Sequence, residues 1–404
     1  MLPEGWFRRP LGEIARITSG GTPDRAEPSY WGGDIPWVTT GEIQFNTIVD
    51  TAEKLTAAGV ENSSAKLFSP GTLLMAMYGQ GKTRGQVAKL GIAASTNQNS
   101  AAIHLQDGHI PDFYFQYLWW KYESIREFGQ SGGISHLNAG LLKQISVPVA
   151  PAAEQHRIAN VLAVWDAAIA TTERLLANSR KQKQGLTLKL FFRSRQAGWP
   201  LVDFDEVFER VTRKNIEGNT RVLTISGAQG LVSQRDYFNK SVAGANLASY
   251  TLLYKGEFAY NKSYSAGYPL GAIKPLLRYD SGVVSSLYLC FRFRDETSAS
   301  ADFFRHYFEA GLLNESISCI AQEGARNHGL LNVGVNDFFK LRLHVPSIEQ
   351  QSQVASILNA AEQHEKSIEV QLEKLRAEKS ALMQQLLTGK RRVRLPARAE
   401  ARRA

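Results

Sequence analysis

The run Gly79-Gln80-Gly81-Lys82-Thr83 is the stretch of the sequence closest to a catalytic motif, since glycines followed by Lys and Thr can hold nucleotide phosphates. That phosphate-binding loop requires a further glycine five residues before Gly81, and Ala76 stands there. The spacing to Gly85 does not give a dinucleotide-binding fingerprint either. No nucleotide site is expected at this position.

Other catalytic chemistry also lacks its residues. A common metal-dependent nuclease needs an acidic residue two positions before a lysine, and the sequence has no such pair. An amino-methyltransferase loop needs Pro-Pro, which does not occur. The eight histidines are scattered, and Cys290 and Cys319 are too few for a cysteine-rich metal site. We therefore expect no active site and no metal in this chain.

Composition favours a polyanionic partner. The net charge is +9 and the sequence pI about 9.4, which favours nucleic acid over other partners. Hydrophobic residues make up 43%, enough for real cores, and no apolar run approaches the ~18–20 residues that span a bilayer. A reducing, cytoplasmic location without membrane contact is expected. Residues 391–404 are expected to form a basic flexible tail.

The sequence contains an internal duplication. Glu154-Gln155 precedes an apolar pattern that returns after Gln350-Gln351, shifted by 196 residues, and the same shift relates further leucines and lysines over some forty residues. Weaker echoes link the globular segments, such as Gly71 with Gly256. The duplication predicts two similar units in tandem.

Two long helices are predicted, over residues 151–195 and 347–390, because these segments are rich in good helix formers and contain no proline after Pro151. Apolar residues recur every three or four positions, as a helix with a partner requires. At 1.5 Å per residue each helix would be ~60 Å long. The expected pairing is an antiparallel coiled coil with pseudo-twofold symmetry; the alternative is an ordinary helical hairpin within one domain. The residues proposed for helix packing and partner binding are Ile158, Leu162, Trp165, Ile169, Leu176, Val354, Leu358, Leu372, Leu375 and Leu386.

 These ten positions form the apolar stripes of the two helices.

The remaining segments, residues 1–150 and 196–346, predict two α+β domains, with short strand-like runs among Gly- and Asn-rich turns. Donor-rich loops recur at matching points of the two halves, and Arg, Asn and Gln can contact base edges while Lys and hydroxyls usually hold phosphates. Any one such loop taken alone is more often a solvated turn. As a set we predict these DNA contacts: Tyr78, Gln80, Lys82, Thr83, Arg84, Gln86, Asn97, Gln98, Ser135, His136, Arg213, Lys214, Asn261, Lys262, Ser263, Tyr264, Arg326, Asn327 and His328.

The sequence resembles the specificity subunits of type I restriction–modification systems over nearly its whole length. The motifs that carry the resemblance are Gly20-Gly21-Thr22-Pro23, Tyr30–Val38, Thr96-Asn97-Gln98, Val284–Tyr288, Glu154–Leu162 and Leu382–Lys390. The first helix departs from the pattern, because it ends without the Thr-Gly-Lys that closes the second.

The resemblance implies a targeting subunit without chemistry of its own. Each recognition domain would bind one half of a split, asymmetric target in double-stranded DNA. The helices would dock two modification subunits, which carry S-adenosylmethionine and methylate adenine, and two restriction subunits, which use ATP and Mg, would complete the complex. Helices of this length predict half-sites about one to two DNA turns apart, at ~34 Å per turn.

Two other classes of protein were weighed. A single-chain restriction endonuclease would cut or methylate DNA without partners, but the missing motifs argue against it. A structural protein with protein-binding domains would lack salt-sensitive binding to duplex DNA.

Overall fold

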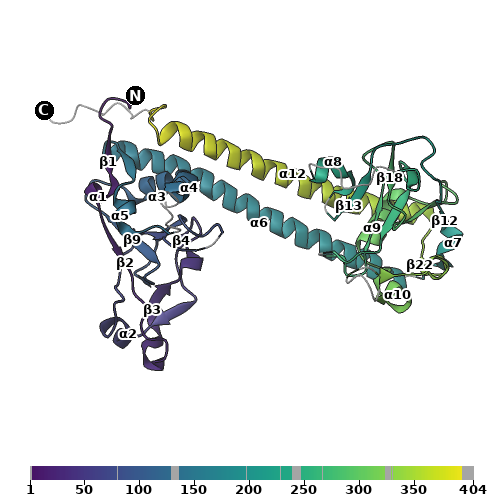
Figure 1. The fold of residues 1–404 in the computed structure, drawn as a ribbon, viewed down its shortest axis with the longest axis horizontal. Helices are drawn as coiled ribbons and strands as arrows, with labels where there is room; N and C mark the ends of the chain where they lie inside the picture. The colour runs from purple at the N-terminus through teal and green to yellow at the C-terminus, as the bar shows by residue number, and fades with distance from the viewer. Residues whose placement is uncertain are drawn as a thin grey trace. The chain divides into compact units, whose positions relative to one another are not determined.

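The computed structural model describes residues 2–79, 81–128, 136–196, 198–227, 229–238, 247–265, 267–323, 329 and 331–393. The chain divides into two compact units (Figure 1). The first unit contains Met1–Glu173 and Val370–Ala404, and the second contains Arg174–Glu369. No helix among the described residues is long and apolar enough to cross a membrane.

The first unit contains a five-stranded sheet and a smaller three-stranded sheet, whose strands are interleaved along the sequence. The larger sheet has the order β2, β9, β6, β7, β4, and the smaller has the order β5, β3, β8. The strands are β2 (Ala15–Ser19), β3 (Trp31–Val38), β4 (Thr47–Ile48), β5 (Glu53–Leu55), β6 (Leu73–Ala76), β7 (Val87–Leu90), β8 (Ser95–Thr96) and β9 (Ser100–Leu105). A separate pair joins β1 (Phe7–Pro10) to β10 (Ser146–Val149). The helices are α1 (Leu11–Ile14), α2 (Ala57–Glu61), α3 (Pro111–Trp120), α4 (Tyr122–Phe128) and α5 (Ala139–Lys143).

The second unit repeats four of the five strands of the larger sheet in the first unit. Its sheet has the order β12, β19, β16, β17, which corresponds to β2, β9, β6, β7 of the first unit. The strands are β11 (Leu201–Asp203), β12 (Phe208–Arg210), β13 (Leu223–Ser226), β14 (Gly230–Ser233), β15 (Thr251–Tyr254), β16 (Phe258–Asn261), β17 (Ala272–Pro275), β18 (Ser281–Val284), β19 (Leu289–Phe293), β20 (Gln322–Glu323), β21 (Leu331–Asn332) and β22 (Arg342–His344). The helices are α7 (Phe204–Val207), α8 (Gln234–Phe238), α9 (Ala301–Glu309), α10 (Asn314–Ile320) and α11 (Val335–Phe339). The α+β class predicted from the sequence is confirmed.

The two predicted long helices are α6 (Ala152–Gln196) and α12 (Ile348–Leu386). Within each unit, stretches of the two helices pair antiparallel. In the first unit Lys379 Nζ lies 2.5 Å from Asp166 and Arg376 2.6 Å from Glu173. In the second unit Arg180 lies 2.5 Å from Glu369. A shift of 196 residues turns the Arg376–Glu173 pair into the Arg180–Glu369 pair, so the duplication extends to the ion pairs between the helices.

Each globular domain is fastened to the start of its long helix by an equivalent glutamine, Gln155 or Gln351. Gln155 Nε2 donates to the Ala150 carbonyl at 2.7 Å, and its Oε1 accepts the Ile110 N–H at 2.9 Å. Gln351 Nε2 donates to the Pro346 carbonyl at 3.0 Å, and its Oε1 accepts the Ser300 N–H at 2.8 Å. Ile110 and Ser300 precede the first turns of α3 and α9, whose own N–H groups lack partners within the helix. The Gln that the two halves share therefore fixes where each domain helix begins.

The segment after α12 packs against the start of the chain. Gly389 has φ +71°, and a Cβ there would lie 2.6 Å from Pro3, which explains a glycine at this position. Arg392 donates to the buried Glu154 carboxylate at 2.8 Å, and Trp6 Nε1 donates to it at 3.0 Å. The sequence predicted a flexible tail over residues 391–404. Residues 391–393 depart from this prediction, because Arg392 is held by an ion pair. Residues 394–404 lie outside the described part of the chain.

Candidate nucleic-acid interface

The loop after β6 presents the first group of predicted contacts. The Leu137 N–H donates to the Met77 carbonyl at 2.9 Å, which brings the segment before α5 beside the end of this strand. As a result the rings of Tyr78 and His136 stack, with centroids 4.8 Å apart and planes 9° apart. Tyr78 remains 41% exposed. An exposed, preorganised aromatic pair can stack on a nucleic-acid base.

Helix α4 holds the rest of this loop. Tyr122 donates to the Lys82 carbonyl, and Arg126 donates to the Gly81 carbonyl at 2.5 Å. Gly79 and Gly85 have φ of +130° and +86°, a conformation that glycine adopts readily. The loop is thereby fixed by its backbone, and the Lys82 side chain is exposed to solvent.

Two motifs of the first half meet at a second loop. Thr22 donates to Gln98, and the Gly21 N–H donates to the Thr96 carbonyl at 2.8 Å. A Cβ at Gly20 would lie 1.9 Å from the Thr96 carbonyl oxygen, so only glycine fits this approach. Gln98 is exposed and is available to a ligand through its amide N–H groups.

Two predicted contacts of the first half are placed inside the domain instead. Arg84 is only 7% exposed. Asn97 is also buried; its Nδ2 donates to Thr40 at 3.1 Å, and its Oδ1 accepts from Asn99 and Ser100. Arg84 is buried and the Asn97 amide is bonded within the domain, so direct base contact by these two side chains is not supported. Thr83, Gln86 and His136 are half-buried, and Gln80 and Ser135 lie outside the described residues.

The second half has an equivalent loop after β16. The Leu331 N–H donates to the Lys262 carbonyl at 2.9 Å, as Leu137 does to Met77, and the Tyr264 N–H donates to the Gly329 carbonyl at 2.7 Å. Tyr264 is 64% exposed, whereas Asn261, Lys262 and Ser263 are half-buried. Both domains thus present an exposed tyrosine just beyond the same strand of the sheet. Arg326, Asn327 and His328 lie outside the described residues.

Arg213 and Lys214 do not join this loop. Arg213 makes two hydrogen bonds to Glu257, of 3.1 and 3.0 Å, which raise its pKa, and Lys214 donates to the Ser249 carbonyl at 3.1 Å. Glu257 precedes β16 while Asn261 ends it, so Arg213 belongs to the opposite end of that strand. The Arg213 guanidinium serves the domain's own fold, and only Lys214 is exposed.

Most of the helix residues proposed for partner binding are already used inside the chain. Seven of the ten are buried within the chain: Ile158, Leu162, Leu176, Val354, Leu358, Leu372 and Leu386. Trp165, Ile169 and Leu375 are half-buried. Apolar side chains that a partner could reach lie at other helix positions, namely Val164, Leu175, Leu188, Phe192, Ile357 and Val370. The apolar period identified the helices correctly, but the stripe it marked faces the fold.

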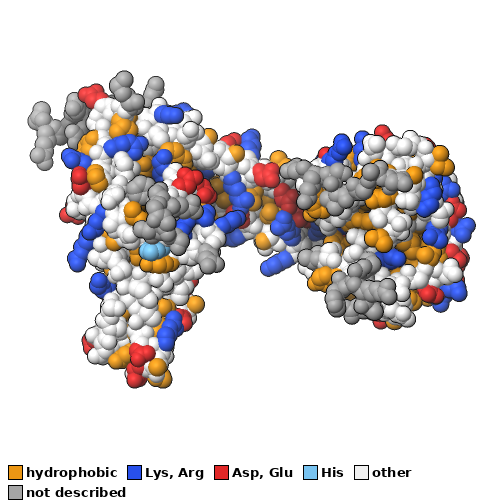
Figure 2. Space-filling view, viewed as in Figure 1, with side chains coloured by type: hydrophobic (Ala, Val, Ile, Leu, Met, Phe, Trp, Pro, Cys, Tyr) orange, Lys and Arg blue, Asp and Glu red, His pale blue; other side chains and the backbone are white. Residues whose placement is uncertain are grey.

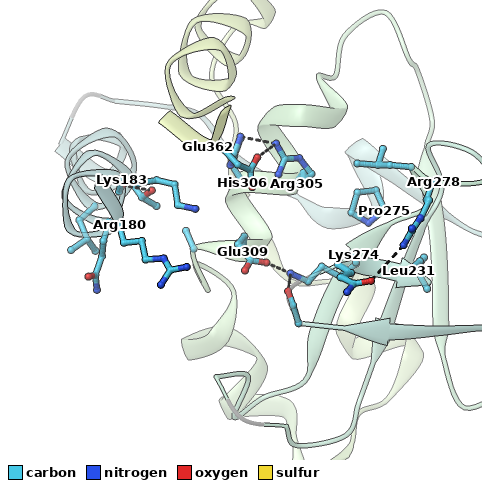
Figure 3. Close-up of a pocket in the computed structure, with 18 residues that line it drawn as sticks. Arg180, Lys183, Leu231, Lys274, Pro275, Arg278, Arg305, His306, Glu309 and Glu362 are labelled. Carbon is cyan, nitrogen blue, oxygen red and sulfur yellow. Dashed lines mark hydrogen bonds and ion pairs between the residues drawn. The ribbon is translucent and has the colours of Figure 1, made fainter. Parts of the chain in front are cut away.

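Sequence reasoning missed a polar cluster in the second unit. A cleft of about 480 Å³ lies between α6, α9 and β17 (Figure 3). Lys274 reaches across it from β17 to Glu309 of α9, and Arg305 and His306 of the same helix lie near Glu362 of α12. The partners stand 35 or more residues apart in sequence, so no local pattern could reveal them.

No three His, Cys, Asp or Glu side chains among the described residues could hold a metal ion. Figure 2 shows Lys and Arg side chains spread over the visible face of each unit. Exposed aromatic rings and cations on rigidly held loops are suited to binding nucleic acid.

Comparisons with known proteins find similarity to one family. Residues 3–178 match the family model described as "Type I restriction modification DNA specificity domain". This part of the chain is therefore similar to the DNA specificity domains of type I restriction–modification systems.

Particular relatives support this. The specificity subunit of the type I restriction enzyme MjaIX from Methanocaldococcus jannaschii is 29% identical over 47% of this chain and 44% of that protein. The EcoR124I/EcoR124II specificity subunit of Escherichia coli is 26% identical over 39% of this chain and 40% of that protein. The matches therefore span less than half the length of these curated relatives.

Two solved structures share the fold. The specificity subunit of the type I system from M. genitalium superposes with a TM-score of 0.56 and 15% identity, over 95% of this chain and 96% of that one. A chain from a study of complex assembly and conformational transition of the type I R-M system gives a TM-score of 0.56 and 14% identity, over 96% and 99% of the two chains. At these identities the likeness establishes the fold.

Proposed function

We propose that this chain selects the DNA target of a type I restriction–modification complex, with each recognition domain contacting one half of a bipartite, asymmetric double-stranded site. The observation that carries the proposal is the pair of equivalent loops after β6 and β16. Both are held by a backbone hydrogen bond from the segment before a short helix, and both expose a tyrosine, Tyr78 or Tyr264. The surroundings differ, because Tyr78 stacks on His136 whereas Tyr264 lies against Gly329. A common scaffold with different exposed groups suits two readers of different sequences.

The chain itself carries no chemistry in this proposal. Methyl transfer would belong to two modification subunits with bound S-adenosylmethionine, and cleavage to two restriction subunits that use ATP and Mg. The exposed apolar side chains of the helices, among them Val164 and Ile357, are the groups available for docking. Val164 lies three residues after Val161, which the 196-residue shift relates to Ile357.

Mapping methylated adenines across a genome tests the proposal directly. The map would be made in cells that contain the modification and restriction subunits, with and without this chain. We expect a split motif to be methylated only when the chain is present. Methylation that is independent of the chain would contradict the proposed function.

Two further experiments separate the parts of the proposal. Binding of the purified chain to duplex DNA should weaken as salt rises, because phosphate contacts release counterions; salt-independent binding would favour a protein-binding role. Inserting or deleting the same few residues in both α6 and α12 should change the spacer between half-sites and leave the half-site sequences intact. An unchanged spacer would refute the idea that the helices set its length.

A further inference from the structure

We infer that Lys274 is a positioning residue that sets the second recognition loop, the described residues 262–265 and 267–271, for DNA reading. This inference rests on the proposed function, since it names what holds one of the two reading loops in place.

Lys274 is a buried cation with several acceptors. It lies on β17, is 7% exposed, and donates to the Gly227 carbonyl at 3.1 Å and to the Tyr268 hydroxyl at 2.9 Å. Its third partner is the Glu309 carboxylate on α9. A buried ammonium is costly unless it is paired and hydrogen-bonded, and here both conditions are met.

Tyr268 closes the network. Its hydroxyl lies 2.6 Å from Glu309 Oε1 and 3.1 Å from the Gly227 carbonyl, so the Tyr268 hydroxyl and the Lys274 ammonium share the same two acceptors. Burial, together with the Glu309 hydrogen bond and charge, raises the pKa of Tyr268, which keeps the phenol protonated as a donor. The cluster therefore ties together the turn between β13 and β14, the loop and α9.

The loop is consequently fixed at both ends. Its first part is held by the Tyr264 N–H on Gly329 and by Leu331 on Lys262, and its last part by Tyr268 in the buried cluster. The exposed Tyr264 side chain is thus carried by a residue whose own backbone belongs to the first anchor. Helix α9, which supplies Glu309, is itself bonded to α12 through the 2.7 Å hydrogen bond from Arg305 to Asn359. The position of the loop therefore depends, through α9, on the part of α12 that belongs to the second unit.

The first unit supplies a matched control. Lys89 lies on β7, the strand equivalent to β17, and has the same offset from the repeated strand as Lys274. It pairs with Asp112 on the domain surface, and this carboxylate is 52% exposed. Lys89→Met makes the same chemical change as Lys274→Met without touching the loop after β6.

The test maps methylated adenines in cells that carry this chain with its modification subunits, for wild type, Lys274→Met, Tyr268→Phe and Lys89→Met. Tyr268→Phe keeps the ring and removes only the hydroxyl, so it decides the matter if Lys274→Met does not accumulate. Tyr78→Ala serves to identify the other half-site. Thermal unfolding of each purified chain accompanies the maps.

We expect Lys274→Met and Tyr268→Phe to relax the same half-site, with methylation at sites bearing one altered base rising roughly tenfold relative to the intact motif. The half-site changed by Tyr78→Ala should stay intact in both, and Lys89→Met should keep the wild-type motif. An unchanged motif in both variants, or an equal loss at all sites, would overturn the positioning role. If the wild-type chain directs no methylation, the proposed function fails, and the inference with it.

Discussion

The buried pair of Lys379 and Asp166 offers the sharpest energetic test of how the first globular domain is attached to the helices. Lys379 is 4% exposed, its Nζ lies 2.5 Å from Asp166 Oδ1, and the same nitrogen lies 3.5 Å from the centroid of the Trp119 ring. Gln116 of α3 donates to the other oxygen of Asp166 at 2.6 Å. Burial lowers the pKa of Lys379, and the hydrogen bond to Asp166 opposes that shift. The pair thus links α12, α6 and α3 within the first unit.

Replacing one partner should be far worse than replacing both. Loss of one member of a buried pair costs about 3–5 kcal/mol, because the other charge is left without its partner. The Asp166 side chain is 32% exposed and keeps Gln116, so we expect a loss somewhat below that range, about 2–3 kcal/mol, for Lys379→Met. In the double variant Lys379→Met with Asp166→Asn no charge is left unpaired. The double variant should therefore lie within about 1 kcal/mol of wild type.

Urea unfolding followed by tryptophan fluorescence suits this measurement. Of the seven tryptophans only Trp199 lies in the second unit, so the signal reports chiefly on the first. Arg376→Gln is the control, because its pair with Glu173 is exposed and should contribute less than about 1 kcal/mol. Additive losses in the double variant, or a loss below about 1 kcal/mol for Lys379→Met, would refute the reasoning.

Three further predictions concern other parts of the fold. Burial, then the nearby Arg305 charge, lowers the pKa of His306 below its ordinary 6.5; the unfolded chain therefore takes up the proton first, and stability should fall as pH drops below 6.5, a loss that His306→Gln should remove in unfolding curves recorded across that range. Gln351→Ala should destabilise the second unit by roughly 1–3 kcal/mol in urea, because it leaves the Ser300 N–H without its acceptor, and a loss under 0.5 kcal/mol would contradict that role. Gly389→Ala should lower stability by roughly 1–3 kcal/mol, since its φ of +71° and the nearby Pro3 disfavour a side chain, and an unchanged melting curve would count against the contact.

The helices and the duplication could be predicted because their signals are local and repeated. Period and composition marked α6 and α12, and the 196-residue shift carried over to the ion pairs Arg376–Glu173 and Arg180–Glu369. What covers the apolar stripe of each helix was harder to predict. A period shows that one face of a helix is apolar, but not whether its own domain or another molecule covers that face.

The loops were predictable only as a set. Tyr78 and Tyr264 were correctly expected on equivalent surface loops, but Arg213 was not distinguishable from a free cation, because its partner Glu257 lies 44 residues away. Lys274 escaped notice for the same reason. Whether a polar side chain serves the fold or a ligand depends on burial and distant partners, which a single sequence does not display.

The contact of Gly389 and Arg392 with the first residues of the chain has a dynamic consequence. In the second unit a peptide chain runs from the end of α6 through Trp199 into the domain, whereas in the first unit the end of α12 meets the domain through non-covalent contacts such as those of Gly389 and Arg392. A joint without a covalent link can fray at the cost of those few contacts, while a linked one cannot drift apart. Amide hydrogens around residues 387–393 should therefore exchange with solvent before those in the core of either sheet.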